Sequence, residues 1–477
     1  LTEAKKQQIH HYELQTMRIV ERNPEKLITS AAKAFALALD PHTNYLSPEN
    51  LEDFEIQMQH SLEGIGASLS SDNGFTVIEE LIPGGAAERS GRLKLKDKII
   101  AVAQEGEKPI SVIDMDLPDI VKMIRGKKGT KVILTILRQA EHTNRFDVTI
   151  TRDKIDIKEQ AAKIDYETRI VGGRQYHFGV IDLPSFYGDE KENTSCYEDV
   201  KNLLAEAKRR HVDGIVLDLS RNGGGLLEEA VRLTGLFLDK GGIVATKDSS
   251  EKVTILAIGA AATGTKGDKR KVIIFPAENP RAVYTGPLVV LTSRLSASAS
   301  EIVAGALKDH HRAVIVGSDR TFGKGSVQAL MQLPLDLGGI TVTTALYFLP
   351  GGKSTQKIGV EADVRLPIWF IHEDIGETGL DYPLPAQAII PFLGILGSTA
   401  QLWKAVEQPL LAELAARSKT RVTKDAKFAE IIKNNKEAAG KKGMIRLSDL
   451  RKEMEKENGG KKKETLTELK QKARDQY

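Results

Sequence analysis

Between residues 160 and 390 the sequence alternates short apolar runs with stretches of helical spacing. Four runs have the composition of strands: 180–183, 214–219, 287–291 and 313–317. Three stretches between and after them are typical of helices: 197–210, 226–238 and 299–310. Such alternation predicts an α/β layered fold with largely parallel strands. A further β-rich run is expected at 340–348.

The flanking regions have different patterns. Residues 61–155 contain β-prone runs and two short helical stretches, and the runs at 131–137 and 146–150 predict an antiparallel pair. Residues 1–60 read as helices, interrupted at 40–48 by two prolines. Residues 391–477 form a charged, helical extension. The chain therefore divides into helical (1–60), small β-rich (61–155), α/β (156–390) and helical, basic (391–477) regions.

Composition excludes few classes of protein. The chain is 41% hydrophobic and 28% charged, as is ordinary for a globular protein. No stretch approaches the ~20 apolar residues of a spanning helix. A net charge of +3 is too small to imply nucleic acid. The basic excess lies in the tail, where 461–463 could touch anionic lipid or RNA, although a solvated helix is the favoured interpretation.

The chain termini and the cysteine content bear on location. The chain starts at Leu1 rather than Met, so we expect a processed or shortened chain whose targeting segment has been removed. The single cysteine, Cys196, excludes an intrachain disulfide. This content suits a reducing compartment and also a bacterial periplasm. Because no histidine is nearby in sequence, we expect Cys196 to be a buried structural side chain.

A serine cluster follows the third strand of the α/β region. Ser296, Ser298 and Ser300 precede a predicted helix. The helix N-terminus would place backbone N–H groups and a favourable dipole beside a serine hydroxyl. One of these serines could therefore be a nucleophile. The alternative is that one is only an N-cap, with Glu301 completing a capping box.

A lysine between two glycines follows the fourth strand. Lys324, in the segment 321–328, is poorly placed for a solvated surface charge. Desolvation would favour its neutral amine, which could take the proton of a serine. The competing interpretation is a phosphate-binding loop, because 323–326 resembles the end of a P-loop. The upstream glycine spacing of that motif is absent, which disfavours it.

Two further elements could take part. Asn222 and the glycines 223–225 lie between a strand and a helix, where N–H groups could form an oxyanion hole; a plain turn is the alternative. A serine–histidine–aspartate triad is the main alternative chemistry. His310 and His311 lie about three helical turns beyond Ser298, too far for a direct base. No histidine, cysteine and carboxylate cluster has zinc spacing, so no metal is expected.

These motifs together resemble a known family, the C-terminal processing peptidases or tail-specific proteases (Prc/Tsp type). The chain is most similar to their large Gram-negative periplasmic type. The matching segments, in family order, are 40–48, 62–66, 217–225, 296–302 and 321–328. The resemblance implies a crotonase/ClpP-like α/β protease core at 156–390. It also implies a PDZ domain inserted at 61–155.

The resemblance assigns roles to individual residues. It implies Ser298 as the nucleophile, Lys324 as the general base and Gln328 as the support of the lysine. Asp309 matches the acidic residue of the helix after the serine. It implies two oxyanion donors, the N–H of Ala299 and that of either Gly224 or Gly225. It also implies a PDZ loop that binds substrate tails and consists of Leu62, Gly64, Ile65, Gly66 and Ala67.

The implied activity is that of a serine endopeptidase that processes or degrades envelope proteins after binding their apolar C-terminal tails. It needs no metal, nucleotide or other cofactor and no nucleic acid. The resemblance also implies a periplasmic location, peripheral contact with the inner membrane and a lipoprotein adaptor. Two other classes remain open: a catalytically silent PDZ scaffold, and a crotonase-like acyl-transfer enzyme or lyase.

The chain also departs from the family pattern. The loop 317–321 is one residue longer than usual, and the longer stretch 251–279 is left unassigned. The large members carry a further helical domain before the region that starts this chain.

Overall fold

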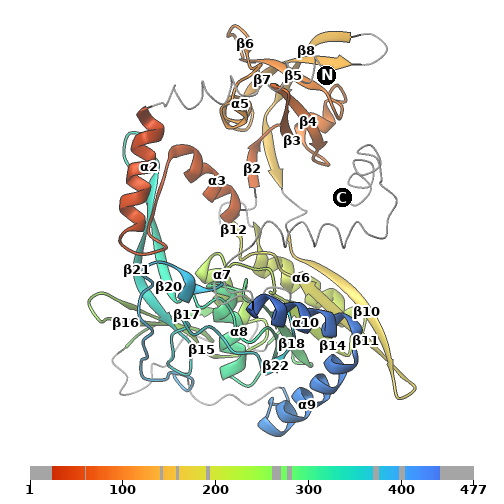
Figure 1. Ribbon diagram of the computed structural model, residues 1–477, viewed down its shortest axis with the longest axis vertical. Helices are drawn as coiled ribbons and strands as arrows, with labels where there is room; N and C mark the ends of the chain where they lie inside the picture. The colour runs from red at the N-terminus through yellow and green to blue at the C-terminus, as the bar shows by residue number, and fades with distance from the viewer. Residues whose placement is uncertain are drawn as a thin grey trace.

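The computed structural model describes most of the chain. It covers residues 24–59, 61–139, 143–156, 161–189, 194–259, 270–276, 282–368, 375–396 and 403–440. The helix expected before residue 24 and the basic tail beyond 440, including 461–463, lie outside the described residues. In Figure 1 a small antiparallel β-domain lies at the top and the larger α/β core at the bottom.

A six-stranded sheet forms the centre of the α/β core. Its strands, in spatial order, are β10 (Lys163–Val171), β11 (Arg174–Asp182), β14 (Gly214–Asp218), β18 (Leu288–Thr292), β19 (Val314–Gly317) and β22 (Val364–Arg365). Only the β10–β11 hairpin is antiparallel, and the remaining neighbours are parallel. The prediction of largely parallel strands is therefore confirmed for this sheet, whereas in the second sheet of the core only β16 and β17 pair in parallel among the described strands. Short Val-, Ile- and Leu-rich runs suit such strands because both faces are covered.

A second sheet lies across from the first. Its strands are β1 (Asn44–Leu46), β21 (Gly339–Phe348), β15 (Gly241–Asp248), β16 (Val253–Gly259) and β17 (Lys271–Pro276), with β20 (Ser326–Gln332) paired to β21. Strands β16 and β17 thus account for much of the stretch left unassigned by the sequence. The β1–β21 pairing brings the chain after the first described helix back to the core (Figure 1).

Helices fill the space between and beside the sheets. α7 (Leu227–Thr234) and α8 (Ala299–Asp309) pack on each other and on β15 of the second sheet, and α8 also contacts β19. α6 (Cys196–Arg209) packs on β10 and β11. Cys196, its first residue, is buried, as predicted. One hydrophobic core, contributed by both sheets and these helices, therefore holds the N-terminus of α8 in place.

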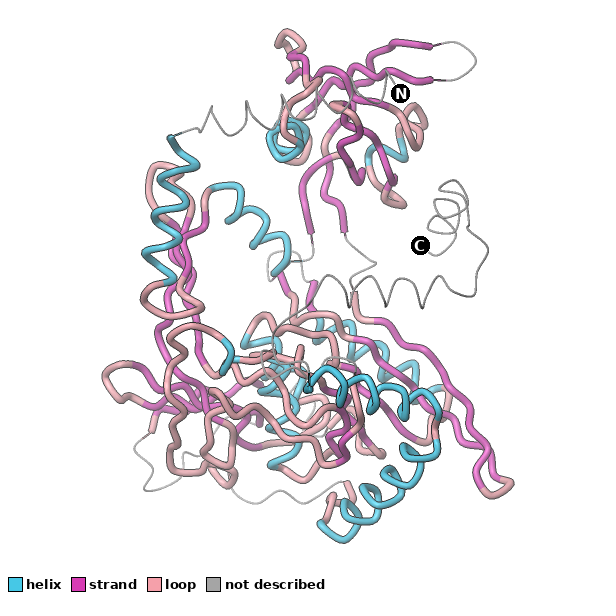
Figure 2. Tube along the Cα trace, in the orientation of Figure 1, coloured by secondary structure: helices cyan, strands magenta, loops and turns pink. Residues whose placement is uncertain are grey.

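The small β-domain has its own hydrophobic core. Its sheet contains β3 (Ala67–Asp72), β4 (Phe75–Leu81), β5 (Lys98–Gln104), β6 (Ile110–Ser111), β7 (Lys131–Gln139) and β8 (Thr143–Thr151). Its helices are α4 (Ala86–Arg89) and α5 (Leu117–Ile124). The predicted β7–β8 antiparallel pair is confirmed. Strand β3 ends the sheet on one side, and α5 packs against it (Figure 2).

The remaining elements connect and flank these units. β2 (Ser61–Gly64) pairs with β9 (Asp153–Asp156), and β12 (Gly188–Asp189) with β13 (Thr194–Ser195). The helices are α2 (Pro24–Leu37), α3 (Pro48–Gln59), the 3₁₀ turn η2 (Glu377–Gly379), α9 (Gln408–Lys424) and α10 (Ala426–Gly440). Among the residues that the structure describes, no helix is long and apolar enough to cross a membrane.

Candidate active site

The three candidate serines lie where β18 turns into α8. The Ser296 hydroxyl donates a hydrogen bond to the carbonyl of Leu219 at 2.7 Å, and the Ser300 hydroxyl donates to that of Asn222 at 2.8 Å. Both serines are fully buried. Ser298 is the N-cap residue of α8, and it lines a cavity of about 880 Å³. Of the three hydroxyls, only that of Ser298 therefore faces space that a substrate can enter.

The backbone at Ser298 has an unusual conformation. Its φ is 55° and its ψ is −114°, a region that costs a non-glycine residue about 1–3 kcal/mol. The loop of residues 222–225 packs directly on this turn. A Cβ on Gly224, whose φ is 112°, would lie 2.9 Å from the Cβ of Ser298. Glycine is therefore required at 224 for the two turns to approach each other.

Lys324 lines the same cavity as Ser298. Burial lowers the pKa of its amine, and the negative charges of Glu377, Glu301 and Asp40, in decreasing order, act against that shift. A lowered pKa increases the fraction of neutral amine that can accept a proton. In the described part of the chain, no hydrogen bond joins the Ser298 hydroxyl to the Lys324 amine.

A buried carboxylate links the backbones of these two residues. Glu301 is completely buried, and its Oε2 accepts hydrogen bonds from the N–H groups of Ser298 and Lys324, both at 2.9 Å. Its Oε1 accepts from the N–H of Gly323 at 2.8 Å and from the hydroxyl of Thr321. Burial raises the pKa of Glu301 to about 7, although these hydrogen bonds oppose the rise. Glu301, the predicted capping residue, therefore also fixes residues 321–325, the loop that carries Lys324 and is called the lysine loop below.

A buried phenol makes a second link between the same residues. The Tyr347 hydroxyl lies 2.5 Å from the carbonyl oxygen of Lys324 and 3.1 Å from that of Ser298. It also accepts a hydrogen bond from the Thr355 hydroxyl at 2.8 Å. Glu301 thus holds the two N–H groups and Tyr347 the two carbonyls. The sequence analysis missed Tyr347, because nothing in its local pattern distinguishes it from an ordinary core tyrosine of β21.

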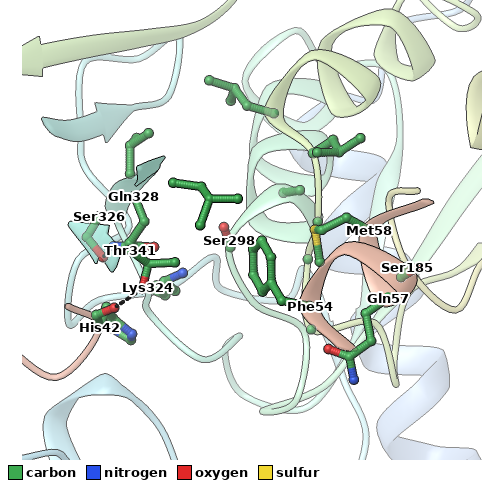
Figure 3. A pocket seen from close by; sticks show the side chains of 18 of the residues that line it. His42, Phe54, Gln57, Met58, Ser185, Ser298, Lys324, Ser326, Gln328 and Thr341 are labelled. Carbon is green, nitrogen blue, oxygen red and sulfur yellow. Dashed lines mark hydrogen bonds between the residues drawn. The ribbon is translucent and has the colours of Figure 1, made fainter. Parts of the chain in front are cut away.

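Figure 3 shows how the cavity is divided. Ser298 lies between a polar group of side chains and an apolar group from α3. The polar group is His42, Lys324, Ser326, Gln328 and Thr341, and the α3 residues nearest to Ser298 in the figure are Phe54 and Met58. A peptide carbonyl at Ser298 would therefore have the base on one side and an apolar wall on the other.

The two predicted supporting residues lie in different places. Gln328 lines the cavity, and its amide donates hydrogen bonds to the hydroxyls of Ser326 and Thr343 at 2.9 and 3.1 Å. Asp309 lies at the far end of α8, where its carboxylate accepts the N–H of Gly351 at 2.7 Å. Asp309 therefore anchors the loop after β21 and does not line the cavity.

The proposed oxyanion donors are also distinguishable. The Gly224 N–H donates to Oδ1 of Asn222 at 2.8 Å, so this amide is already engaged. Gly225 and Ala299 both line the cavity. As the first residue of α8, Ala299 has an N–H without an intrahelical partner. This geometry disfavours Gly224 as a donor and leaves Gly225 and Ala299.

The predicted tail-binding loop spans two strands of the small domain. Leu62 and Gly64 lie in β2, in register with Ile155 and Asp153 of β9. Ile65 and Gly66 connect β2 to the edge strand β3, which begins at Ala67. The carbonyls of Ile65 and Gly66 accept hydrogen bonds from Ala87 and Ile82, which fix the loop on the domain core.

The site contains one histidine that the sequence analysis did not consider. His42 lines the cavity, and its Nε2 lies 2.8 Å from the carboxylate of Glu377. The two residues are 335 positions apart, so no local pattern could have paired them. No group of three or more potential ligands for a metal ion occurs among the described residues.

Comparison with known proteins adds three family matches. Residues 177–366 match the peptidase family S41, residues 54–137 match the PDZ domain, and residues 1–49 match the tail specific protease N-terminal domain. The first of these ranges contains both Ser298 and Lys324. The second contains the antiparallel β-domain up to β7.

Curated relatives carry corresponding names. The chain is 36% identical over 390 residues to the tail-specific protease of Haemophilus influenzae, which covers 80% of this chain and 52% of that protein. It is 31% identical over 357 residues to the carboxy-terminal-processing protease of Bartonella bacilliformis, covering 74% of this chain and 72% of that protein. The chain thus spans about half the length of the Haemophilus relative.

Solved structures are similar in parts. The photosystem II D1 C-terminal processing protease is 27% identical, with a TM-score of 0.39, covering 74% of this chain and 86% of that chain. The PDZ domain of the carboxy-terminal protease from Vibrio cholerae, solved with a peptide, is 45% identical, with a TM-score of 0.20. That match covers 20% of this chain and 97% of that one.

The α/β core, the PDZ domain and the matches together define a serine-type peptidase. The chain belongs to the S41 peptidases, among the tail-specific and carboxy-terminal-processing proteases.

Proposed function

We propose that this chain is an endopeptidase in which Ser298 is the nucleophile and Lys324 the general base, and in which the PDZ domain selects substrates by their C-terminal tails. The observation that carries the proposal is the cavity. Of the three candidate serines, Ser298 alone lines it, together with a lysine whose pKa burial lowers.

The proposed reaction is acyl transfer to serine. Lys324 accepts the proton of the Ser298 hydroxyl as its oxygen attacks the scissile carbonyl carbon. The N–H groups of Ala299 and Gly225 stabilise the developing oxyanion, and one such donor contributes about 3–4 kcal/mol in other enzymes. Lys324 then donates the proton to the leaving amine, and water hydrolyses the acyl-enzyme. The hydrogen bond from Ser298 to Lys324 would form once substrate is bound.

Tail recognition is proposed at the edge of the PDZ domain. Among the residues that the structure describes, β3 is an edge strand of its sheet, and α5 packs beside it. An extended C-terminal segment can add to such an edge as a further strand. The terminal carboxylate would then bind N–H groups of the loop at Ile65, Gly66 and Ala67, while an apolar terminal side chain enters the domain between β3 and α5.

The location and the partners belong to the same proposal. Envelope substrates, a periplasmic location, peripheral contact with the membrane and a lipoprotein adaptor follow from the family resemblance. The absence of a disulfide at the single, buried Cys196 is compatible with that location. Fractionation of cells that produce the native protein would test it. Recovery in the cytoplasmic fraction would exclude the periplasm.

The test is cleavage of an unfolded reporter protein that ends in an apolar tail, beside the same reporter with a charged tail. The wild type should cut the first faster, and Ser298→Ala and Lys324→Ala should not cut either. Lys404→Ala, which removes an exposed lysine, serves as the matched control and should keep full activity. Tail binding without cleavage by the wild type would support a silent PDZ scaffold instead.

A further inference from the structure

The turn between α2 and β1 has no role in the mechanism above, although it is the first of the segments that carry the family resemblance. Asp40 is buried, and its carboxylate accepts hydrogen bonds from the N–H groups of His42 and Thr43 at 2.9 and 3.0 Å. It also accepts from the Thr43 hydroxyl. Because β1 then pairs with β21, the turn is held on both sides and His42 has a fixed direction.

His42 lines the cavity near Lys324 (Figure 3). Its Nε2 lies 2.8 Å from Oε2 and 3.1 Å from Oε1 of Glu377. The Glu377 side chain is only 1% exposed, so this carboxylate depends on its partners within the protein. The second partner is Gln356, whose amide donates to Oε1 at 2.7 Å.

Glu377 and Gln356 in turn hold the lysine loop. The Glu377 N–H donates to the carbonyl of Phe322 at 2.9 Å. The Gly325 N–H donates to Oε1 of Gln356 at 2.8 Å. These bonds lie two residues before and one residue after Lys324. The His42–Glu377 pair therefore lies next to the base both in space and in the hydrogen-bond network.

A second chain of hydrogen bonds starts from the same turn. The Thr343 hydroxyl donates to Oδ1 of Asp40 at 2.9 Å. The amide of Gln328 donates to that hydroxyl at 3.1 Å. The turn is thus connected to the lysine loop through His42. Through Asp40 it is connected to Gln328, the proposed supporting glutamine.

We propose that His42 and Glu377 are positioning residues of the catalytic base, and that the turn at 40–43 exists to place His42. The inference rests on the proposed role of Lys324. The His42 ring nitrogen holds the Glu377 carboxylate and offsets its charge at the lysine. The charged groups around the amine come from three elements: Asp40 from the turn, Glu301 from α8 and Glu377 from η2. Among these, Glu377 acts most strongly on the lysine.

The first experiment compares three substitutions of His42 by kcat and KM on the apolar-tailed reporter. His42→Ala should lower kcat about 10- to 100-fold, as expected when a reacting group is misplaced by about 1 Å. His42→Gln should keep most of the activity, because its amide nitrogen can occupy the place of Nε2. His42→Asn, whose amide nitrogen matches Nδ1 instead, should resemble alanine. His177→Ala removes an exposed histidine and should leave both constants unchanged.

The second experiment separates positioning from general packing through the pH dependence of kcat. Glu377→Gln removes a negative charge that favours protonated Lys324, so the acidic limb should move to lower pH. His42→Ala leaves the Glu377 charge less offset, so the same limb should move to higher pH. Shifts in opposite directions are not expected from two changes that merely loosen the fold.

The outcomes distinguish this inference from the proposed function. If Ser298→Ala is inactive while His42→Ala and Glu377→Gln match the wild type in kcat and pH profile, the positioning role is wrong and the dyad stands. If Lys324→Ala stays active and His42→Ala does not, His42 is itself the base and both proposals fail. If His42→Ala does not fold, equal kcat for the Gln and Asn variants would still overturn the inference.

Discussion

The replacement Glu301→Gln tests whether the buried carboxylate of α8 holds Ser298 and Lys324 in place and whether its burial makes stability depend on pH. Glutamine keeps the shape but loses the charge, and its NH₂ group would face two of the four donors that now bind the carboxylate. Burial raises the pKa of Glu301 from 4.5 to about 7. At ~1.36 kcal/mol per pKa unit, ionising this group in the folded protein costs about 3 kcal/mol more than in the unfolded chain.

The sign of the pH dependence follows from linkage. Between pH 4.5 and about 7 the folded state binds more protons at Glu301 than the unfolded state does. The contribution of Glu301 to the free energy of unfolding is therefore full below pH 4.5 and falls as the pH rises to about 7. Glutamine does not titrate. The stability of Glu301→Gln relative to the wild type should consequently rise by about 3 kcal/mol from pH 4.5 to pH 7.5.

The assay is urea unfolding of both proteins at four pH values in this range, with cleavage of the apolar-tailed reporter measured in parallel. Peptidase activity of Glu301→Gln should fall at every pH, because in either orientation its NH₂ group faces two donors, those of Ser298 and Lys324 or those of Thr321 and Gly323. A stability difference that does not change with pH would refute the reasoning about burial. Full activity would refute the claim that the link between the two backbones matters.

Three other substitutions test single contacts. Tyr347→Phe removes the hydroxyl that binds the carbonyls of Ser298 and Lys324, so kcat should fall with little change in KM, and an unchanged kcat would exclude a positioning role. Gly224→Ala should abolish cleavage, because its Cβ would lie 2.9 Å from that of Ser298; activity near that of the wild type would contradict this packing. Asp309→Asn should lower the melting temperature without changing the pH profile of kcat, because its carboxylate binds Gly351 outside the cavity; a shifted profile would place it in catalysis.

Much of the fold could be predicted because its signals are local. Apolar runs such as 214–219 and 287–291 form neighbouring parallel strands, as the alternating pattern indicates. The sequence leaves the stretch 251–279 unassigned, although 255–258 is a continuous apolar run. It forms β16, whose pairing with β15 and β17 depends on distant strands. A local pattern indicates a strand, but its partners depend on tertiary contacts.

The site could be predicted only in part for the same reason. Ser298 and Lys324 lie in short segments with distinctive composition, and the family resemblance selects them. His42 and Glu377 meet only because β1 pairs with β21 and the 3₁₀ turn packs on the lysine loop. The hydrogen bond from the Gly224 N–H to Asn222 depends on the side-chain rotamer of Asn222, and the sequence does not reveal that rotamer.

The central claim is that Ser298 is the nucleophile and that Lys324 activates it. The most direct measurement is labelling of the native protein with a serine-reactive fluorophosphonate, followed by mass spectrometry of its peptides. The account predicts one adduct on Ser298, none in Ser298→Ala, and strongly slowed labelling in Lys324→Ala. An adduct on Ser296 or Ser300, or labelling of Ser298 at an unchanged rate without Lys324, would contradict it.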